Sequence, residues 1–276
     1  MAREGKNDIF RAEKQEVKQP TSIAWEVPVE VVPVPSRGVI YPPGSPLHGK
    51  ETLEIKAMTA KEEDILTSRA LIKQGTVITH LIKSCLIDKD VDVQKMIIGD
   101  RNALMISIRI TGYGSNYTAS ATCPACSRES SNMFDLSSLG IKRLQISPAT
   151  HGQNCFEFNL PVSKRKVFFK FLTGADEEEI QTTNDRKQQL MPDMVVENNV
   201  TARLEQSIIS VDGITDRSEI VRFIRSMPAM DSRSLRRFMD DNQPGIDMMV
   251  DMRCQFCNDT SKISLPFGSS FFWPRD

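Results

Sequence analysis

The chain has 276 residues, of which 39% are hydrophobic and 26% are charged, as in an ordinary globular protein. Its 35 Lys and Arg residues are balanced by 36 Asp and Glu residues, which argues against a dedicated nucleic-acid binder. No apolar run approaches the roughly 18 residues that cross a membrane, and residues 1–8 lack the apolar core of a signal peptide. We therefore expect a reducing compartment, where paired cysteines bind metal more often than they form disulfides.

The beginning of the chain is expected to be an extended arm. Residues 1–22 are polar and highly charged, without a helical or strand period. Residues 27–35 alternate valine with proline, and proline excludes such a segment from the middle of a sheet. Two interpretations remain open: an edge strand or surface crossover of this chain, or an arm that lies on a partner subunit. In the second interpretation, the residues that contact the partner are Trp25, Val31 and Val34.

The next stretch predicts a strand followed by two helices. Residues 51–58 alternate polar and apolar side chains, which indicates a strand. Thr59 with Glu62 three residues later forms a capping box, so a helix is expected from Thr59 to about Lys73. A second, apolar helix is expected over residues 77–86.

The middle of the chain leads to the first of two CxxC pairs. The period of residues 91–98 and 102–110 does not decide between helix and strand. Residues 113–122 are rich in Ser, Thr and Tyr and predict a strand that runs into the Cys123–Cys126 pair. Residues 132–136 then lead away from it.

The second half predicts a hairpin and further helices. Residues 156–160 and 166–172 indicate the two strands of the hairpin. Helices are expected over residues 201–210 and 216–227, followed by a basic amphipathic turn over residues 231–239.

Parts of the two halves are alike in order and spacing. The segment Thr59–Ile65 and the segment Thr173–Ile180 each follow a strand and begin an acidic helix. The segment Leu81–Asp88 is echoed by Leu204–Asp212. This similarity predicts an internal duplication, in which each copy has a strand, helices and a CxxC pair.

The expected fold class is therefore α+β, with two pseudo-repeated strand-plus-helices units. We expect an extended arm over residues 1–48, a first repeat over residues 49–150 and a second repeat over residues 151–276. A zinc-ribbon-like four-cysteine site, split between the repeats, would join them.

The cysteine pairs are the strongest local signal for chemistry. Two CxxC loops are the usual ligand set of a closed structural Zn²⁺ site, here Cys123, Cys126, Cys254 and Cys257. The gap of 127 residues between the loops exceeds the usual spacing of roughly 15–20 residues. The alternative is two unrelated pairs of reduced cysteines. The other two cysteines, Cys85 and Cys155, are interpreted as buried core residues.

No combination of residues predicts an enzyme. The three histidines, His48, His80 and His151, lie in unrelated settings. The acidic runs 62–64 and 177–179 stand at expected helix N-termini, where acidic side chains complement the helix dipole. The arginines Arg233, Arg236 and Arg237 are interpreted as a solvated or subunit-facing surface.

The end of the chain carries three consecutive aromatic residues, Phe271, Phe272 and Trp273. They either fold back onto the core or bind a partner. The first interpretation is favoured, because exposed apolar patches of this kind are usually covered.

Several motifs together resemble the baseplate protein family of T-even-like contractile-tailed phages. They are Pro35-Ser36-Arg37-Gly38 to Tyr41-Pro42, the Thr59–Ile65 helix start, the two CxxC pairs, Pro244-Gly245 and Phe271-Phe272-Trp273-Pro274. The resemblance covers roughly residues 35–276. It implies a baseplate hub component or hub-assembly protein, which binds other tail subunits but no small-molecule substrate and no membrane. Its expected location is the virion, and the host cytoplasm during assembly. A zinc-ribbon nucleic-acid-binding or regulatory protein is the alternative.

Overall fold

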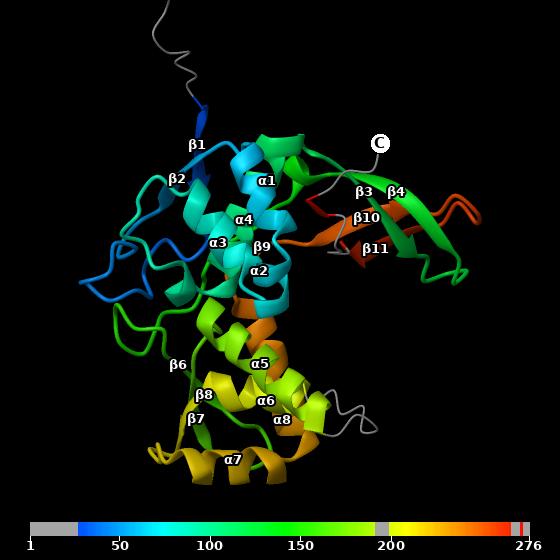
Figure 1. Ribbon diagram of the computed structural model, residues 1–276. Helices are drawn as coiled ribbons and strands as arrows, with labels where there is room; N and C mark the ends of the chain where they lie inside the picture. Colours follow the sequence, from blue (N-terminus) through cyan, green and yellow to red (C-terminus); the bar gives the residue numbers. More distant parts are fainter. Residues whose placement is uncertain (1–26, 191–198, 266–270, 273–276) are drawn as a thin grey trace, which may run out of the picture.

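The computed structural model describes residues 27–190, 199–265 and 271–272. Helices and strands are mixed, as expected for an α+β protein. Figure 1 shows an upper lobe with β1, β2 and α1–α4, a lower lobe with α5–α8 and β6–β8, and two long hairpins that project to one side. Trp25 and Trp273 lie outside the described residues.

The upper lobe begins with a strand pair, not with an arm. Strand β1 (Val29–Pro33) pairs antiparallel with β2 (Thr52–Lys56), so the edge-strand interpretation is correct for this segment. Residues 34–47 continue into the fold, and the side chains of Ile40, Tyr41 and Leu47 are buried. The expected boundary between the arm and the first repeat, at residue 48, is thus misplaced, because residues 34–47 supply side chains to the core.

Three short helices follow: α1 (Ala60–Thr67), α2 (Arg69–Gln74) and α3 (Val77–Cys85). The capping box at Thr59 and Glu62 is present. The single helix expected from Thr59 to Lys73 is wrong, because Ser68 has an extended backbone with ψ of 106° and separates α1 from α2.

Helix α4 (Ile98–Tyr113) runs through the centre of the upper lobe and resolves the ambiguity over residues 102–110. A single 3-10 turn, η2 (Val93–Lys95), precedes it. Beyond α4 lie β3 (Asn116–Thr122), β4 (Glu129–Asp135), the 3-10 turn η3 (Leu136–Ser138) and β5 (Ile141–Lys142).

The lower lobe contains a three-stranded sheet of order β6-β7-β8. The predicted hairpin is present as β6 (Phe156–Asn159) and β7 (Lys166–Phe169). The helix expected over residues 201–210 is too long: α6 (Asn199–Ser207) ends before β8 (Ile208–Val211), which pairs with β7. Three helices complete the lobe: α5 (Gly174–Leu190), α7 (Arg217–Ser226) and α8 (Ala229–Asn242). The expected basic turn is part of α8.

The last part of the chain returns to the upper lobe. Strand β9 (Gly245–Ile246) pairs with β5. Gly99 of α4 lies close to Pro244: a Cβ atom on Gly99 would be 1.7 Å from the carbonyl oxygen of Pro244. Strands β10 (Met249–Arg253) and β11 (Thr260–Ser264) then form the second projecting hairpin.

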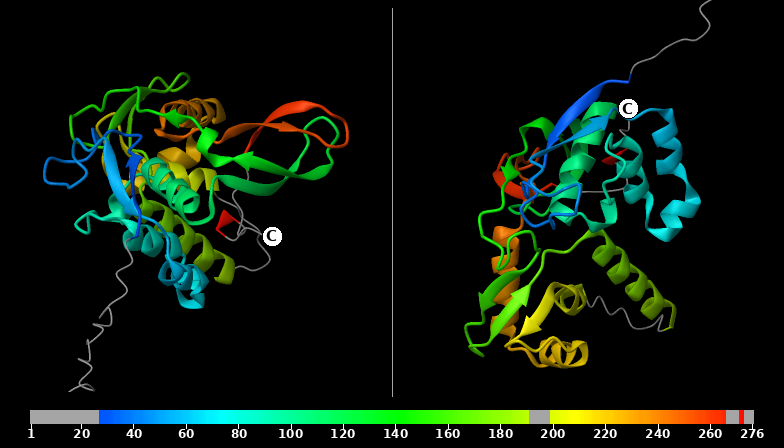
Figure 2. Two further views of the ribbon diagram at one scale, coloured as in Figure 1. Left: turned by 90° about the horizontal axis from the view of Figure 1, so that it is seen from above. Right: turned by 90° about the vertical axis from the view of Figure 1, so that its left-hand side faces the viewer.

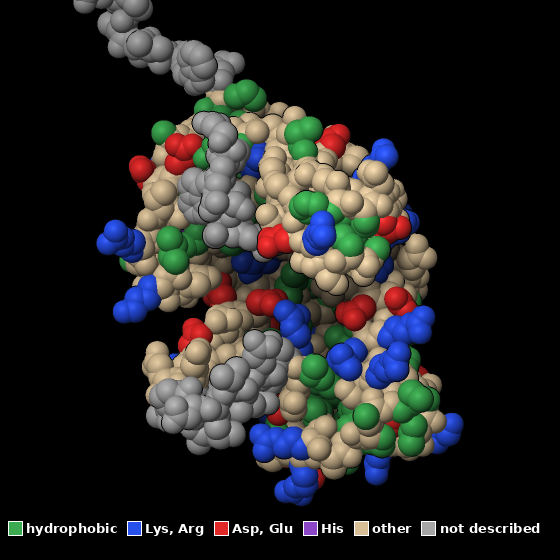
Figure 3. Space-filling model, turned by 90° about the vertical axis from the view of Figure 1, so that its right-hand side faces the viewer, with side chains coloured by type: hydrophobic (Ala, Val, Ile, Leu, Met, Phe, Trp, Pro, Cys, Tyr) green, Lys and Arg blue, Asp and Glu red, His purple; other side chains and the backbone are tan. Residues whose placement is uncertain are grey.

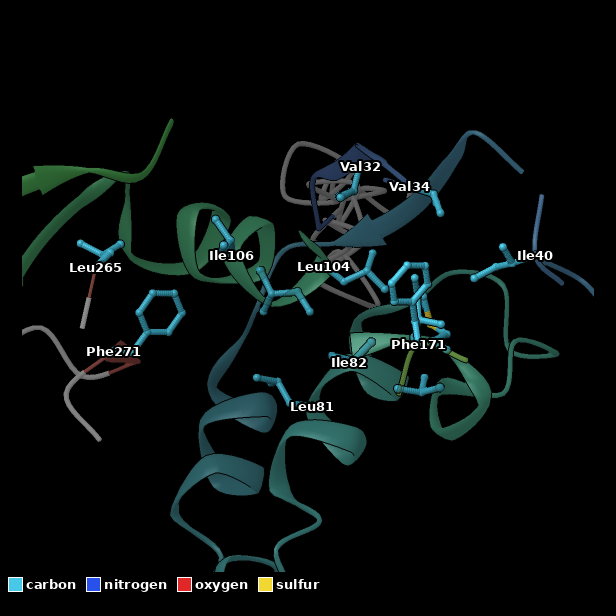
Figure 4. Packing of buried hydrophobic residues seen from close by; sticks show 14 of the residues in the cluster. Val32, Val34, Ile40, Leu81, Ile82, Leu104, Ile106, Phe171, Leu265 and Phe271 are labelled. Atoms are coloured by element: carbon cyan, nitrogen blue, oxygen red, sulfur yellow. The ribbon is translucent and has the colours of Figure 1, made fainter. Parts of the chain in front are cut away.

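One cluster of buried hydrophobic residues extends through both lobes. Figure 4 shows part of it, with Val32, Ile82 and Phe171 around Leu104 of α4, and Ile106 on the side of Leu265 and Phe271. Phe271 and Phe272 belong to the same cluster and are 2% and 5% exposed. The fold-back interpretation of the C-terminal aromatic residues is therefore correct for these two.

Candidate metal centre

The two CxxC loops form nearly identical turns. In the first, the N–H of Ser127 donates to the carbonyl of Cys123 at 2.8 Å; in the second, the N–H of Asn258 donates to the carbonyl of Cys254 at 3.0 Å. Ser127 and Asn258 also adopt the left-handed backbone region, with φ of 58° and 57°. Each loop therefore turns its two sulfur atoms to the same side. Each loop also stands at the tip of an antiparallel hairpin, β3–β4 or β10–β11.

The hairpins lie side by side and bring all four sulfur atoms together (Figures 1 and 2). The Sγ atoms of Cys123 and Cys257 are 3.7 Å apart, and those of Cys126 and Cys254 are 3.6 Å apart. All four lie within 4.8 Å of one another. A tetrahedron with Zn–S bonds of about 2.3 Å has S···S edges of about 3.8 Å, and the distances of 3.7 Å and 3.6 Å agree with such edges. The same distances are far too long for disulfide bonds of about 2.05 Å.

The surroundings of Cys254 favour a thiolate, whereas, despite a backbone hydrogen bond, burial and the neighbouring thiols raise the pKa of Cys257 to about 12. Cys123 and Cys254 are buried, whereas Cys126 is partly exposed and Cys257 is exposed. The backbone N–H groups of Cys257 and Phe256 point at the Cys254 sulfur and lower its pKa to about 6. A thiolate is the form that binds a metal ion.

Contacts between the hairpin tips hold the loops together. The side-chain amide of Gln255 donates to the carbonyl of Ser131 at 2.8 Å, and the guanidinium of Arg128 lies 5.3 Å from the centre of the Phe256 ring. The centre can thus clasp two distant parts of the chain. The CxxC spacing within each loop identifies the four cysteines in the sequence, and the structure brings the two pairs together.

The other two cysteines differ from these four. Cys85 is buried in α3, and burial raises its pKa to about 11. Cys155 is partly exposed, and burial also raises its pKa. The core interpretation is confirmed for Cys85.

The predicted partner-contact residues fall into different environments. Val31 is 57% exposed, on the outer face of β1. Val34, Phe271 and Phe272 are buried in the core of this chain, which corrects their assignment to a partner surface. Their side chains are already packed against residues of the same chain.

The predicted surface arginines have acidic neighbours. Arg237 lies 3.6 Å from Asp241, and Arg236 and Asp240 line the same cavity of about 290 Å³. Figure 3 shows acidic and basic side chains around the hollow between the lobes. These arginines therefore do not form a uniformly basic patch. Of the histidines, His48 and His151 have ring centres 5.8 Å apart.

Acidic side chains at two helix N-termini, Glu62 and Asp176, also accept hydrogen bonds from side chains and backbone groups nearby. Glu62 is fully buried and accepts hydrogen bonds from Lys56 at 2.8 Å, from Ser84 at 2.6 Å and from the backbone of Thr59 at 3.0 Å. Asp176 accepts equivalent bonds from Lys170 at 2.7 Å and from the backbone of Thr173 at 2.9 Å.

Two further buried charges were not identified from the sequence. Asp100 accepts hydrogen bonds from the hydroxyl groups of Ser36 and Tyr41, both at 2.6 Å, and burial raises its pKa. Arg109 donates to the carbonyl groups of Phe271, Gly114 and Asn116. Both residues lie in an apolar helix, and nothing in the local sequence distinguishes them from exposed charges.

A family model described as "T4 bacteriophage base plate protein" matches residues 45–273. No curated protein and no solved structure gives a significant match. Within the described ranges, no helix has the length and apolar character needed to span a bilayer.

Proposed function

Since the chain belongs to the T4 bacteriophage base plate protein family, we propose that it is a structural, non-enzymatic subunit of a phage tail baseplate. It takes part in assembly of the baseplate or its hub through contacts with other tail subunits, in the host cytoplasm and then in the virion. The observation that carries this proposal is the family match, which covers 229 of the 276 residues, from 45 to 273.

The four-cysteine centre holds a structural Zn²⁺ ion in this proposal. The support is the close approach of four sulfur atoms, the all-cysteine ligand set and the thiolate-favouring environment of Cys254. Such a closed ligand set leaves no open coordination position for a substrate. The ion joins the β3–β4 hairpin to the β10–β11 hairpin and so clasps the two halves of the chain.

We also infer that the two halves are pseudo-repeats. Each half has an antiparallel strand pair, then helices, then a hairpin that carries CxxC. The sets Lys56/Thr59/Glu62 and Lys170/Thr173/Asp176 have the same spacing and make the same hydrogen bonds. The residue before each lysine also has an equivalent strand partner. Ile55 forms a β-bridge with Leu86, and Phe169 pairs with Ile208. The first repeat then includes β1, and the arm is limited to the residues before it.

Contacts with other subunits are assigned to the N-terminal side of the molecule. Val31 is exposed on β1, and Trp25 precedes it in the sequence. Trp273, which lies outside the described residues, is a second candidate because its large aromatic side chain can anchor a partner.

Mass spectrometry of purified tails and of baseplate assembly intermediates tests the proposed function. We expect the protein in at least one of these preparations, in a fixed ratio to other baseplate subunits. Preparations from phage that lacks this protein are the control. Absence of the protein from both particles and intermediates would contradict the proposal.

A further inference from the structure

The outer edge of β1 carries main-chain groups without partners among the described residues. The Val34 N–H donates to Glu51 and the Ala57 N–H donates to Pro28, both at 2.8 Å, so the even-numbered residues of β1 face β2. The N–H and C=O groups of Val29 and Val31 therefore point away from β2. No hydrogen bond of the described part of the chain reaches them.

The side chains at this edge are apolar and exposed. Val29 and Val31 are 56% and 57% exposed, whereas Val32, on the opposite face, is in the core. Exposed, apolar edge strands are templates for pairing with another chain, and natural proteins usually block them with charges, bulges or proline. Prolines stand at both ends of this segment, but Pro28 faces β2, so only Pro33 removes an N–H group from the outer edge. Beyond Pro33, the Leu144 N–H donates to Pro35, so this chain itself covers the edge there.

We propose that the outer edge of β1 binds an extended strand of another baseplate subunit by β-augmentation. The bound strand places apolar or β-branched residues opposite Val29 and Val31. It places Lys or Arg opposite Glu30, which is exposed and has no ion-pair partner in the described structure. The inference deepens the proposed function and rests on it for the existence of such a partner.

A second copy of this chain is a poorer occupant. Outward-facing residues must pair with outward-facing residues in an antiparallel ladder. Pairing Val29 with Val31 of a second copy sets Glu30 directly opposite Glu30, and like charges in that position are destabilising. Pairing Val31 with Val31 sets Val29 opposite Pro33, which has no N–H to donate. Pairing Val29 with Val29 sets Glu30 opposite Pro28, which offers no charge to pair with it. A foreign strand with a basic residue has none of these defects.

Residue-resolved hydrogen exchange of the Val29 and Val31 amides tests the proposal, measured in the isolated protein and in purified baseplates or their intermediates. We expect both amides to exchange rapidly in the isolated protein and at least about a hundredfold more slowly in the assembly. Equally rapid exchange in assemblies that contain the protein would overturn the strand-addition proposal and leave the proposed function intact. Absence of the protein from all assemblies would instead contradict the proposed function. Protection in the isolated protein that grows with its concentration would identify a second copy as the occupant and overturn the proposal.

A matched pair of variants tests the same edge by incorporation into baseplates. Val31→Pro removes the outward N–H, which β2 does not use, and proline is tolerated on such an edge. Val31→Thr keeps the N–H and the branched shape. We expect Val31→Pro to reduce incorporation by about tenfold or more while its melting temperature stays close to that of Val31→Thr. Equal incorporation of two folded variants would contradict the proposal; if Val31→Pro does not fold, the exchange experiment decides.

Discussion

At the scale of single residues, the molecule depends on a few buried polar groups whose partners lie far away in the sequence. Cys123 is 134 residues from Cys257, yet their sulfur atoms are 3.7 Å apart. Glu62 is 22 residues from Ser84 and bonds to it at 2.6 Å. Such contacts make individual substitutions at these positions costly.

Replacement of one cysteine from each loop tests whether the four ligands form one site. We expect Cys123→Ser and Cys254→Ser to abolish metal binding and to destabilise folding to a similar degree, by about 4 kcal/mol or more, because a structural site needs all four ligands. Native mass spectrometry reports the ions per chain, and urea denaturation reports stability. Cys155→Ser is the control and should keep one ion. A loss of stability for only one of the two loops would exclude a shared site.

Glu62 makes stability depend on pH. Burial alone would raise its pKa, but hydrogen bonds from Lys56, Ser84 and Thr59 outweigh this and lower the pKa from 4.5 to about 2. A carboxylate with a depressed folded-state pKa stabilises the fold fully above its unfolded pKa, and this contribution is lost as the pH falls toward 2.

Glu62→Gln should therefore lower the free energy of unfolding at pH 7 by about 1–3 kcal/mol. The difference from the unsubstituted protein should shrink between pH 5 and pH 3. Urea denaturation across this range, with the exposed Glu129→Gln as control, measures the effect. A difference that does not change with pH would show that the charge of Glu62 is unimportant.

At the scale of elements, α4 connects the C-terminal aromatic residues to the β3–β4 hairpin, which carries the first CxxC loop. Arg109 near the end of this helix donates to Phe271 at 2.6 Å, to Gly114 at 2.7 Å and to Asn116 at 3.1 Å. Gly114 ends α4 and Asn116 begins β3. The ring of Phe271 also packs against Tyr117, with centres 5.2 Å apart. One guanidinium thus fixes the helix end, the hairpin base and the returning chain.

Arg109→Met should destabilise the protein by about 2–4 kcal/mol, because three carbonyl groups lose their donor. Limited proteolysis should then cleave the C-terminal segment faster than in the unsubstituted protein. Arg253→Met, at an exposed position of β10, is the matched control and should change stability by less than about 0.5 kcal/mol. Unchanged proteolysis of a destabilised Arg109→Met protein would contradict the role assigned to this contact.

At the scale of the whole molecule, the two halves are joined where α4 meets the chain between α8 and β9. Gly99 approaches Pro244 too closely for any side chain, and β9 pairs with β5 of the other half. This contact and the four-cysteine cluster are two separate connections between the same halves.

Gly99→Ala should weaken the first connection. The added methyl group would meet the Pro244 carbonyl at 1.7 Å, so the backbone must shift, at a cost of about 1–3 kcal/mol. Gly44→Ala is the control, because no atom lies within 4 Å of a Cβ there. Thermal unfolding of both variants measures the effect. Equal melting temperatures would show that this contact contributes nothing to the stability of the molecule.

Much of the local structure was predictable because its determinants are short-range. The capping box at Thr59, the hairpin of β6 and β7 and the ligand pairs in both CxxC loops depend on residues a few positions apart. The resemblance to the baseplate family, carried by the order of such motifs, is confirmed by the family match.

Long-range pairing decided what local patterns left open or made wrong. Residues 208–211 follow a helix without a break, and only pairing with β7 makes them a strand. Val31 and Val34 look alike in the sequence, but the packing of β1 and the segment after it on the core exposes Val31 and buries Val34. Arg109 and Asp100 are interior residues because the chain returns to cover α4. The sequence by itself determined which cysteines form pairs at the hairpin tips, whereas the tertiary structure decided that the pairs meet, because only the packing of both halves brings the two hairpins side by side.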